Sequence, residues 1–238
     1  MRLPWDATRS TRDSSLLLSI SEGLDSVHRA RVDEEDIAYQ ANKIVRECLD
    51  KRAIDYETYR TWRQKNPNIF TAIVDSSNQL IGFFDIFPLA DDTAEEIIAG
   101  KRNEKSLTID DILPPEKTSS VKYLYIATVM ANPHQKTFST AAASDITLLK
   151  FEEFISDVYA PTDQRTYIAF AHTKEGQALV RRCEFALISL PQDNPQGDPL
   201  FILKGGELTG VLNKFQGLQK RLSAKREKAT HKGRICRV

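Results

Sequence analysis

The sequence predicts an α/β (α+β) fold, a mixed sheet with a central parallel strand pair flanked by helices. Strand-like apolar runs alternate with helix-like apolar periods along most of the chain. The longest run, Val121 to Met130, is apolar on both faces, which is typical of a central strand covered by helices on both sides. A helical pattern from Thr140 to Ser156 separates it from a second strand, 166–171. This spacing predicts that the two strands lie parallel and are joined by a right-handed crossover.

The N-terminal part of the chain predicts an arm followed by helices. Residues 1–30 are rich in Ser, Arg and Asp without a sustained period, so we expect a loosely packed arm. The acidic run from Asp33 to Asp36 favours a helix N-terminus, and apolar residues at helical spacing continue to Leu49. Further helices are expected at Asp55–Gln64 and Thr93–Gly100.

The remaining strands follow from short apolar runs. Two of them, 69–74 and 80–87, flank the turn-forming segment Asp75 to Gln79, which predicts a hairpin whose second strand ends at Pro88. After a helix at Thr173–Cys183, the runs 185–188 and 200–203 are expected to complete the sheet. The layered domain should therefore span residues 31–205.

Residues 206–238 form a basic C-terminal segment, expected to be a helix and tail. An apolar stripe that includes Leu208, Leu212, Phe215 and Leu222 predicts a docked helix over about 206–225. Nine Lys or Arg residues lie between positions 214 and 237, against the single acid Glu227. They indicate either a solvated end of the helix or a contact surface for a protein partner or a nucleic-acid backbone.

Composition narrows the classes of function. Lys and Arg together number 33 and so do Asp and Glu, so no global charge draws the chain to nucleic acid or to an anionic membrane. The body also lacks a recognised nucleic-acid-binding motif, so nucleic acid is not the expected partner. The three cysteines are too few and too far apart for a disulfide framework or a zinc cluster, and no metal site is expected. Without a membrane span or signal peptide, the expected location is the cytoplasm.

Three regions carry a resemblance to a known family. The first is Trp62-x-x-x-Asn66-Pro67, followed by the hairpin with its Ile81-Gly82 element. The second follows Pro133 and reads Lys136-Thr137-Phe138-Ser139-Thr140-Ala141. The third is Thr173-x-x-Gly176-x-x-Leu179-Val180-Arg181-Arg182-Cys183-Glu184-Phe185. With the order of elements over residues 33–203, these regions resemble the GNAT superfamily of N-acetyltransferases.

The resemblance implies an acetyl-CoA site with an altered loop. In the family, an Arg-x-x-Gly-x-Gly/Ala turn opens a helix whose N–H groups bind the cofactor pyrophosphate. Here Lys136 stands at the Arg position, Ser139 replaces the first glycine and Ala141 fits the last position. In the third region, Val180 stands where many members carry a tyrosine general acid, and Glu184 replaces a glycine.

The resemblance also implies a reaction, the direct attack of an amine on the thioester of acetyl-CoA, with a base to take the amine proton. The parallel strands should splay apart, so that pantetheine pairs with the first of them near Ala127 to Met130. Asp85 could contact the amine or cap a turn. The expected catalytic candidates are Tyr125, His134 and His172. The expected cofactor contacts are Ala127, Val129, Met130, Lys136, Thr137, Phe138, Ser139, Thr140 and Ala141.

Two other functions compete with acetyl transfer to an amine of unknown identity. The chain could be a catalytically impaired GNAT-fold binding or regulatory module that acts through a protein partner recruited by the C-terminal helix. It could also be a nucleic-acid-binding protein that uses the basic tail. The rest of the chain has no excess of positive charge, which disfavours this interpretation. Cofactor binding separates the first alternative from the enzyme, and salt-dependent binding to DNA or RNA tests the second.

Overall fold

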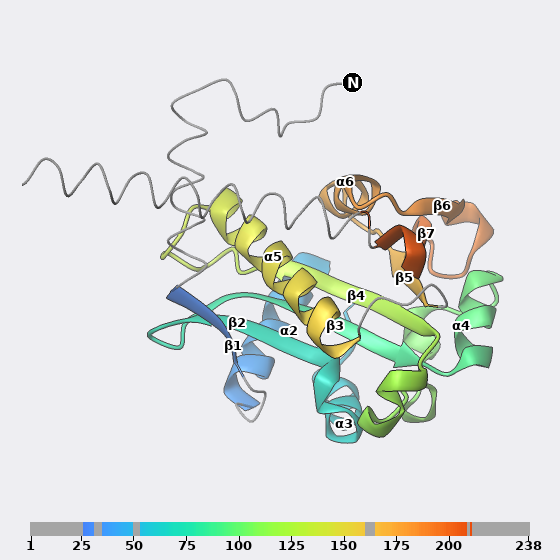
Figure 1. The fold of residues 1–238 in the computed structure, drawn as a ribbon, viewed down its shortest axis with the longest axis horizontal. Helices are drawn as coiled ribbons and strands as arrows, with labels where there is room; N and C mark the ends of the chain where they lie inside the picture. Colours follow the sequence, from blue (N-terminus) through green and yellow to red (C-terminus); the bar gives the residue numbers. More distant parts are fainter. Residues whose placement is uncertain (1–25, 31–34, 50–52, 160–164, 209, 211–238) are drawn as a thin grey trace, which may run out of the picture.

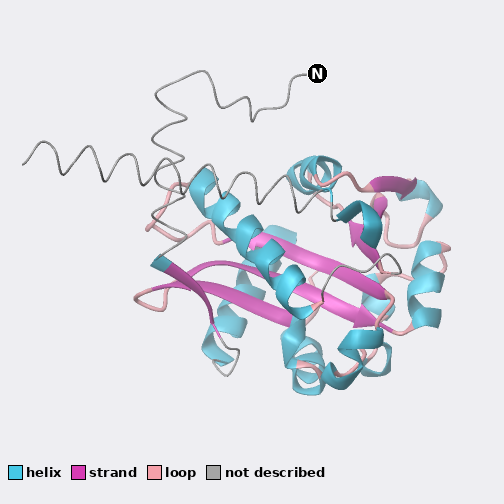
Figure 2. Cartoon of the chain, in the orientation of Figure 1, coloured by secondary structure: helices cyan, strands magenta, loops and turns pink. Residues whose placement is uncertain are grey.

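The computed structural model describes residues 26–30, 35–49, 53–159, 165–208 and 210. The described strands form a seven-stranded sheet in the order β1-β2-β3-β4-β5-β7-β6 (Figure 1). All neighbouring strands are antiparallel except β4 and β5, which are parallel. Helices pack against this sheet (Figure 2). The predicted fold class, a mixed sheet with a central parallel pair flanked by helices, is confirmed, and it is the arrangement that the resemblance to the GNAT superfamily implies.

The elements lie close to their expected positions. The strands are β1 (Val27–Ala30), β2 (Phe70–Asp75), β3 (Leu80–Leu89), β4 (Tyr123–Ala131), β5 (Thr166–Phe170), β6 (Ala186–Ser189) and β7 (Leu200–Lys204). The α-helices are α2 (Glu35–Leu49), α3 (Tyr56–Lys65), α4 (Asp91–Ile98), α5 (Thr140–Val158) and α6 (Lys174–Arg182). Short 3₁₀ helices are η2 (Pro67–Ile69), η3 (Glu104–Ser106), η4 (Ile109–Asp111), η5 (Pro115–Ser120) and η6 (Pro191–Asp193).

The hairpin of β2 and β3 turns at Asp75. Its carboxylate accepts hydrogen bonds from the main-chain N–H groups of Ser77 (2.8 Å) and Gln79 (3.0 Å), as a turn-forming aspartate does. The expectation that Pro88 ends the second strand is wrong. Pro88 lies inside β3 opposite Leu124, and the strand continues to Leu89 because the missing N–H of a proline does not prevent its carbonyl from pairing.

The two faces of the sheet are covered by different helices, and α5 crosses the face turned to the viewer in Figure 1. Side chains of β3 separate two cores: Phe84 and Ile86 pack in the cluster that contains the apolar side of α5. Phe83 and Phe87 pack in the cluster that contains the apolar sides of α2 and α3. All residues of β3 are buried, as expected for a strand with helices on both faces.

Helix α5 approaches the sheet closely at Gly82. A Cβ atom at this position would lie 2.0 Å from the Thr147 Oγ1 atom and 3.0 Å from the main-chain oxygen of Met130. Thr147 is itself buried, and its hydroxyl donates to the main-chain oxygen of Ala143 at 2.8 Å. The absence of a side chain at Gly82 therefore allows α5 to rest on β3.

Helix α6 ends in a Schellman motif with a residue other than glycine at its left-handed position. The Phe185 N–H donates to the Val180 oxygen (3.0 Å), and the Glu184 N–H donates to the Arg181 oxygen (3.1 Å). Glu184 has a φ of 63°, a conformation that L-residues other than Asn and Asp seldom adopt. The structure thus requires positive φ at the position where the family carries glycine.

Both ends of the chain fall largely outside the described residues. Residues 26–30, which we expected within a loosely packed arm, instead contain β1, which pairs with β2 at the edge of the sheet. Residues 205–208 are helical and Leu208 is buried, whereas 211–238, with the other stripe and tail residues, lie outside the described residues. No helix in the described part of the chain has the length and apolar content needed to cross a bilayer.

We predict that Gly82→Ala destabilises the protein by about 1–3 kcal/mol, because the added methyl group overpacks the contact with α5. The free energy of unfolding from urea denaturation measures the effect. In the Thr147→Ala background the same substitution should cost less, since the Oγ1 atom that it meets is gone. Equal costs in both backgrounds would contradict the proposed contact.

We predict that Glu184→Gly stabilises the protein by about 0.5–1 kcal/mol, because glycine adopts positive φ without the steric cost that Glu184 bears. Glu184→Ala is the matched control, since it removes the carboxylate but keeps the Cβ atom that makes positive φ costly. Chemical denaturation should show a gain for glycine only. A similar gain for alanine would place the effect in the side chain and not in the backbone.

Candidate active site

The candidate site begins where the parallel pair β4–β5 separates. The two strands are paired only from Tyr123 to Tyr125 on β4, opposite Thr166 to Ile168 on β5. Beyond this point β5 pairs with β7 alone, while β4 continues along β3 to Ala131. Within the described residues, the side of β4 from Ile126 to Ala131 that faces away from β3 has no strand partner. The predicted splaying of the two strands is therefore present in the structure.

A β-bulge lies at the start of this open stretch. Thr128 pairs with Asp85 and Ile126 pairs with Ile86, so Ala127 is an extra residue on β4. A bulge leaves main-chain groups outside the ladder and changes the direction of neighbouring side chains. Ala127 and Thr128 both line a pocket on the α2/α3 side of the sheet. The open strand edge and the pocket therefore meet at the bulge.

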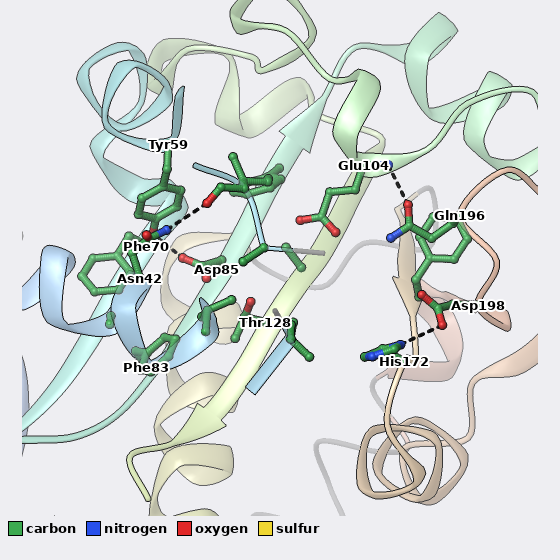
Figure 3. A pocket seen from close by; sticks show the side chains of 18 residues that line it. Asn42, Tyr59, Phe70, Phe83, Asp85, Glu104, Thr128, His172, Gln196 and Asp198 are labelled. Atoms are coloured by element: carbon green, nitrogen blue, oxygen red, sulfur yellow. Dashed lines mark hydrogen bonds and ion pairs between the residues drawn. The ribbon is translucent and has the colours of Figure 1, made fainter. Parts of the chain in front are cut away.

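The pocket holds about 680 Å³ of space, including its open mouth. Its aromatic lining residues are Tyr59, Phe70, Phe83, Phe87 and Phe170. In Figure 3, Tyr59, Phe70 and Phe83 lie on one side, and Glu104, His172, Gln196 and Asp198 on the other. Asp85 and Thr128 lie between them. A mostly apolar lining with a few polar groups is typical of a site for a small organic molecule.

Asp85 is a buried carboxyl that accepts hydrogen bonds from two hydroxyl side chains. The Tyr59 hydroxyl donates to its Oδ1 atom, and the Thr128 side chain is a second hydrogen-bond partner. Burial raises the pKa of Asp85 to about 6, and the hydrogen bonds from Tyr59 and Thr128 oppose that rise. Asp85 lies in the middle of β3, so it does not cap a turn.

Glu104, in η3, faces Asp85 across the pocket. Burial raises its pKa to about 7, and Coulombic repulsion by Asp85 and Asp198 adds to the rise. The Tyr125 hydroxyl donates to the Glu104 Oε2 atom at 2.8 Å and opposes the rise. Burial holds the pKa of Tyr125 well above its usual value, so this donor keeps its proton at neutral pH.

His172 and Asp198 form a second polar pair in the pocket. The His172 Nδ1 atom lies 2.9 Å from the Asp198 Oδ1 atom, and Asp198 is buried. With an ionised Asp198, which can only accept, the contact requires an Nδ1–H donor, and Nε2 is the ring nitrogen that faces away from Asp198. The Asn194 side chain donates to the main-chain oxygen of Asp198 at 2.9 Å and holds this loop in place.

The loop that opens α5 lies at the far end of the open strand. Ser139 is the N-cap of α5, and its hydroxyl accepts from the Ala142 N–H. The Gln135 side chain brackets Phe138, accepting from its N–H (2.9 Å) and donating to its oxygen (2.8 Å). Among the described residues, positive φ occurs at four positions, none of them in this loop. The turn therefore forms with Ser139 in place of glycine, without backbone strain.

The three predicted catalytic candidates lie in different surroundings. His172 lines the pocket, and Tyr125 lies buried beneath Glu104. The side chain of His134 is 65% exposed, and its Nε2 atom lies 2.8 Å from the Glu47 Oε2 atom on α2. His134 is not among the described residues that line the pocket.

The predicted cofactor contacts follow the open strand and the loop. Ala127, Val129 and Met130 are half-buried on β4 beyond its pairing with β5. Phe138 is half-buried and packs against the core under α5. The other loop residues are exposed, namely Lys136, Thr137, Ser139, Thr140 and Ala141.

Sequence reasoning missed two of the three acidic residues of the pocket. Glu104 lies in the polar segment between Lys101 and Ser120, and Asp198 lies in a loop before β7, where no motif marks either residue. Only their contacts, with Tyr125 and His172, reveal their place in the site. No group of three or more metal-ligating side chains suited to a metal ion occurs in the described part of the chain.

Comparisons with known proteins find similar folds among solved structures. No protein-family model matches the sequence, and no curated protein matches it. A mutant of spermidine N-acetyltransferase SpeG from Vibrio cholerae is similar in structure, with a TM-score of 0.48, 8% identity, and coverage of 80% of this chain and 98% of that chain. Ard1 from Thermoplasma volcanium has a TM-score of 0.46 and 8% identity, covering 74% of this chain and 95% of that chain.

Naa50 from Arabidopsis thaliana, solved in complex with the bisubstrate analogue CoA-Ac-MVNAL, has a TM-score of 0.44 and 9% identity. This similarity covers 75% of this chain and 99% of that chain. At such low identity and with TM-scores below 0.5, the three likenesses say nothing about the activity of this chain.

We predict that Tyr125→Phe raises the pKa of Glu104 above its value of about 7, because the lost hydrogen bond favours the ionised form. The ¹³C chemical shift of the labelled carboxyl, followed against pH by NMR, measures the change. Tyr123→Phe is the matched control on the same strand, since the Tyr123 hydroxyl lies 3.4 Å from Glu95 and not beside Glu104. A pKa that stays constant or falls in Tyr125→Phe would contradict the assigned role of this hydroxyl.

Proposed function

We propose that this chain is an N-acetyltransferase that transfers the acetyl group of acetyl-CoA to an amine. The observation that carries the proposal is the continuity of three features along β4: the acidic pocket, the open main chain of Ile126 to Ala131, and the N-terminus of α5. An extended arm with amide groups can pair with an open strand edge, as an added strand does. A phosphate group at its end suits a helix N-terminus.

The residues present fit such a co-substrate. The Ser139 hydroxyl accepts from the Ala142 N–H, and the Ser139 oxygen accepts from the Ala143 N–H. The N–H groups of Thr140 and Ala141, earlier in the same turn, lie at the exposed end of the helix, where an anion can accept from them. Lys136 is exposed in the adjoining loop and supplies a positive charge. We therefore assign the pyrophosphate to Lys136 and residues 138–141, and the pantetheine arm to Ala127, Val129 and Met130.

The pocket supplies the groups that the reaction needs. Acetyl-CoA brings the acetyl group as a thioester, which an uncharged amine attacks at the carbonyl carbon. Glu104 takes the first proton from the incoming ammonium group, since a pKa of about 7 leaves a useful fraction ionised at neutral pH. The C–N bond then forms as the C–S bond breaks, and the second amine proton passes to the leaving thiolate. The Tyr125 hydroxyl positions the Glu104 carboxylate.

His172 is the second candidate for the base. Its Nδ1 atom faces Asp198, and Nε2, which faces away from that carboxylate, is the nitrogen proposed to act as the base. Tyr125 itself holds its proton too tightly to act as a base, because burial and Glu104 raise its pKa. His134 contacts Glu47 outside the pocket and has no part in the proposed reaction.

We predict that calorimetric titration detects acetyl-CoA binding, and that Lys136→Ala weakens it by about 10- to 100-fold. This is the loss expected on removing one charged hydrogen bond, on the order of 1.5–3 kcal/mol. Lys117→Ala is the matched control, because Lys117 is an exposed lysine of η5, before β4 instead of after it. The control should bind like the wild type.

If neither wild type nor Lys136→Ala binds acetyl-CoA at millimolar concentration, the enzyme proposal fails. The binding or regulatory module, acting through a protein partner, is then the better description of this chain. Equal weakening in the Lys117→Ala control would show a general electrostatic effect and would contradict the assigned phosphate site.

A further inference from the structure

The acidic residues of the pocket differ from an ordinary buried acid of this protein. Asp111 has the usual arrangement: the Arg102 guanidinium contacts both of its oxygens, at 2.9 and 2.7 Å. Burial opposes ionisation there too, but the bonds from Arg102, Thr93 and Thr108 lower the pKa of Asp111 to about 2. A charged acid inside a protein is normally compensated in this way by a cation.

In the pocket, that compensation is weak. Asp85, Glu104 and Asp198 come from three different segments and all line the same space. Among the described lining residues there is no Lys or Arg, and His172 is the basic side chain present. Arg63 and Lys105 act on Asp85 and Glu104 from outside the lining, and burial still dominates both carboxyls. A cation that enters the pocket would compensate the negative charge of these carboxylates.

The opposite wall of the pocket is apolar except for Asn42, whose amide donates to the main-chain oxygen of Ile54. It is formed by side chains of α2 and of the segment after it, among them Val45, Leu49 and Ile54. Phe70 and Phe83 continue this wall on β2 and β3, and Figure 3 shows them across from Glu104 and Asp198. A second charged group placed against this wall would lose its water without gaining a partner. The wall therefore favours an uncharged hydrocarbon or aromatic group.

From this division of the pocket, and resting on the proposed acetyl transfer, we infer that the acceptor is a primary amine carried on an apolar body without an acidic group. The ammonium group lies between Asp85 and Glu104, beside Ala127 and Thr128 at the open edge of β4. The apolar body lies against α2. Amino acids, whose carboxylate would face Asp85 and Asp198, and polyamines, whose second cation would face α2, are poor ligands of this pocket.

A series of matched small molecules tests this inference by calorimetry on the full chain at low salt and without acetyl-CoA. The probes are 2-phenylethylamine, 2-phenylethanol, 3-phenylpropionate, phenylalanine and 1,4-diaminobutane. We expect 2-phenylethylamine to bind at least about tenfold more tightly than each of the others, the effect of one charged contact or of the apolar ring. If 3-phenylpropionate or phenylalanine binds as tightly or more tightly, the assignment of charge in the pocket is wrong. If 1,4-diaminobutane binds as tightly or more tightly, the assignment of an apolar wall is wrong.

Substitutions of the two acidic residues test where in the pocket the ammonium group binds. Asp85→Asn and Glu104→Gln should each weaken 2-phenylethylamine binding about tenfold or more. Asp110→Asn, which alters an exposed acid of η4, should leave it unchanged. Each site variant is a separate test, so one of them suffices if the other fails to fold. Wild-type affinity in both folded variants overturns the inference.

The pH dependence gives a further readout. Glu104 faces Asp85, Asp198 and Tyr125, with Lys105 nearby, and it ionises as the pH rises through about 7. The amine remains protonated over that range, so its affinity should increase between pH 6 and 8. This increase should be reduced in Glu104→Gln. A wild-type affinity that falls over this range contradicts the assigned contact.

An assay with acetyl-CoA separates this inference from the proposed function. If acetyl-CoA binds but 2-phenylethylamine neither binds nor is acetylated, the acceptor class is wrong while the acetyl-CoA site stands. If 2-phenylethylamine binds selectively but acetyl-CoA does not bind, the charge and the apolar wall are assigned correctly and the transferase proposal fails.

Discussion

The short ladder between β4 and β5 is the constraint on which the candidate site depends. Three residue pairs hold the parallel strands together, and then each strand keeps only its outer neighbour. A longer ladder would close the edge of β4 from Ile126 to Ala131 and bring Phe170 and His172 against it. Because the ladder stops, the bulge at Ala127 lies at the floor of a pocket instead of inside a continuous sheet.

Successive side chains of β3 point to opposite faces of the sheet, and this alternation links the two halves of the site. Gly82 lets α5 rest on one face of the strand, and Asp85 reaches the pocket on the other. A shift of one residue in the pairing of β3 would exchange these faces. It would bring Asp85 under α5 and a bulkier side chain against Thr147. The position of the α5 N-terminus and that of the pocket carboxyl are thus fixed by one register.

The layered architecture could be predicted from the sequence because it depends on local patterns. The apolar run of β4, the periodic pattern of α5 and the spacing to β5 predict the parallel pair, and the pairing of Tyr123 with Thr166 confirms it. Strand β1 was missed because its four residues, two of them polar or charged, give no clear alternation, and its place comes from pairing with β2.

The site was less accessible to sequence reasoning than the fold. His172 was found because it follows a predicted strand, whereas Glu104 and Asp198 lie in loops that only tertiary packing brings together. Asp85 could be noticed as an acid within an apolar strand, but its partner Tyr59 is distant in sequence. The assignments of individual residues to catalysis and to acetyl-CoA remain predictions, since they depend on molecules that bind there.

The loop before α5 has a consequence for how this region can change in evolution. Its residues all have negative φ, so the backbone imposes no requirement for glycine between Pro133 and Ala141. Main-chain N–H groups at the end of a helix can bind a ligand whichever side chains their residues carry, so in the proposed site only Lys136 contributes through its side chain. Positions of this loop other than Gln135 and Ser139, whose side chains hold its shape, can therefore change while its shape is kept, and a glycine signature can disappear from a loop whose geometry persists.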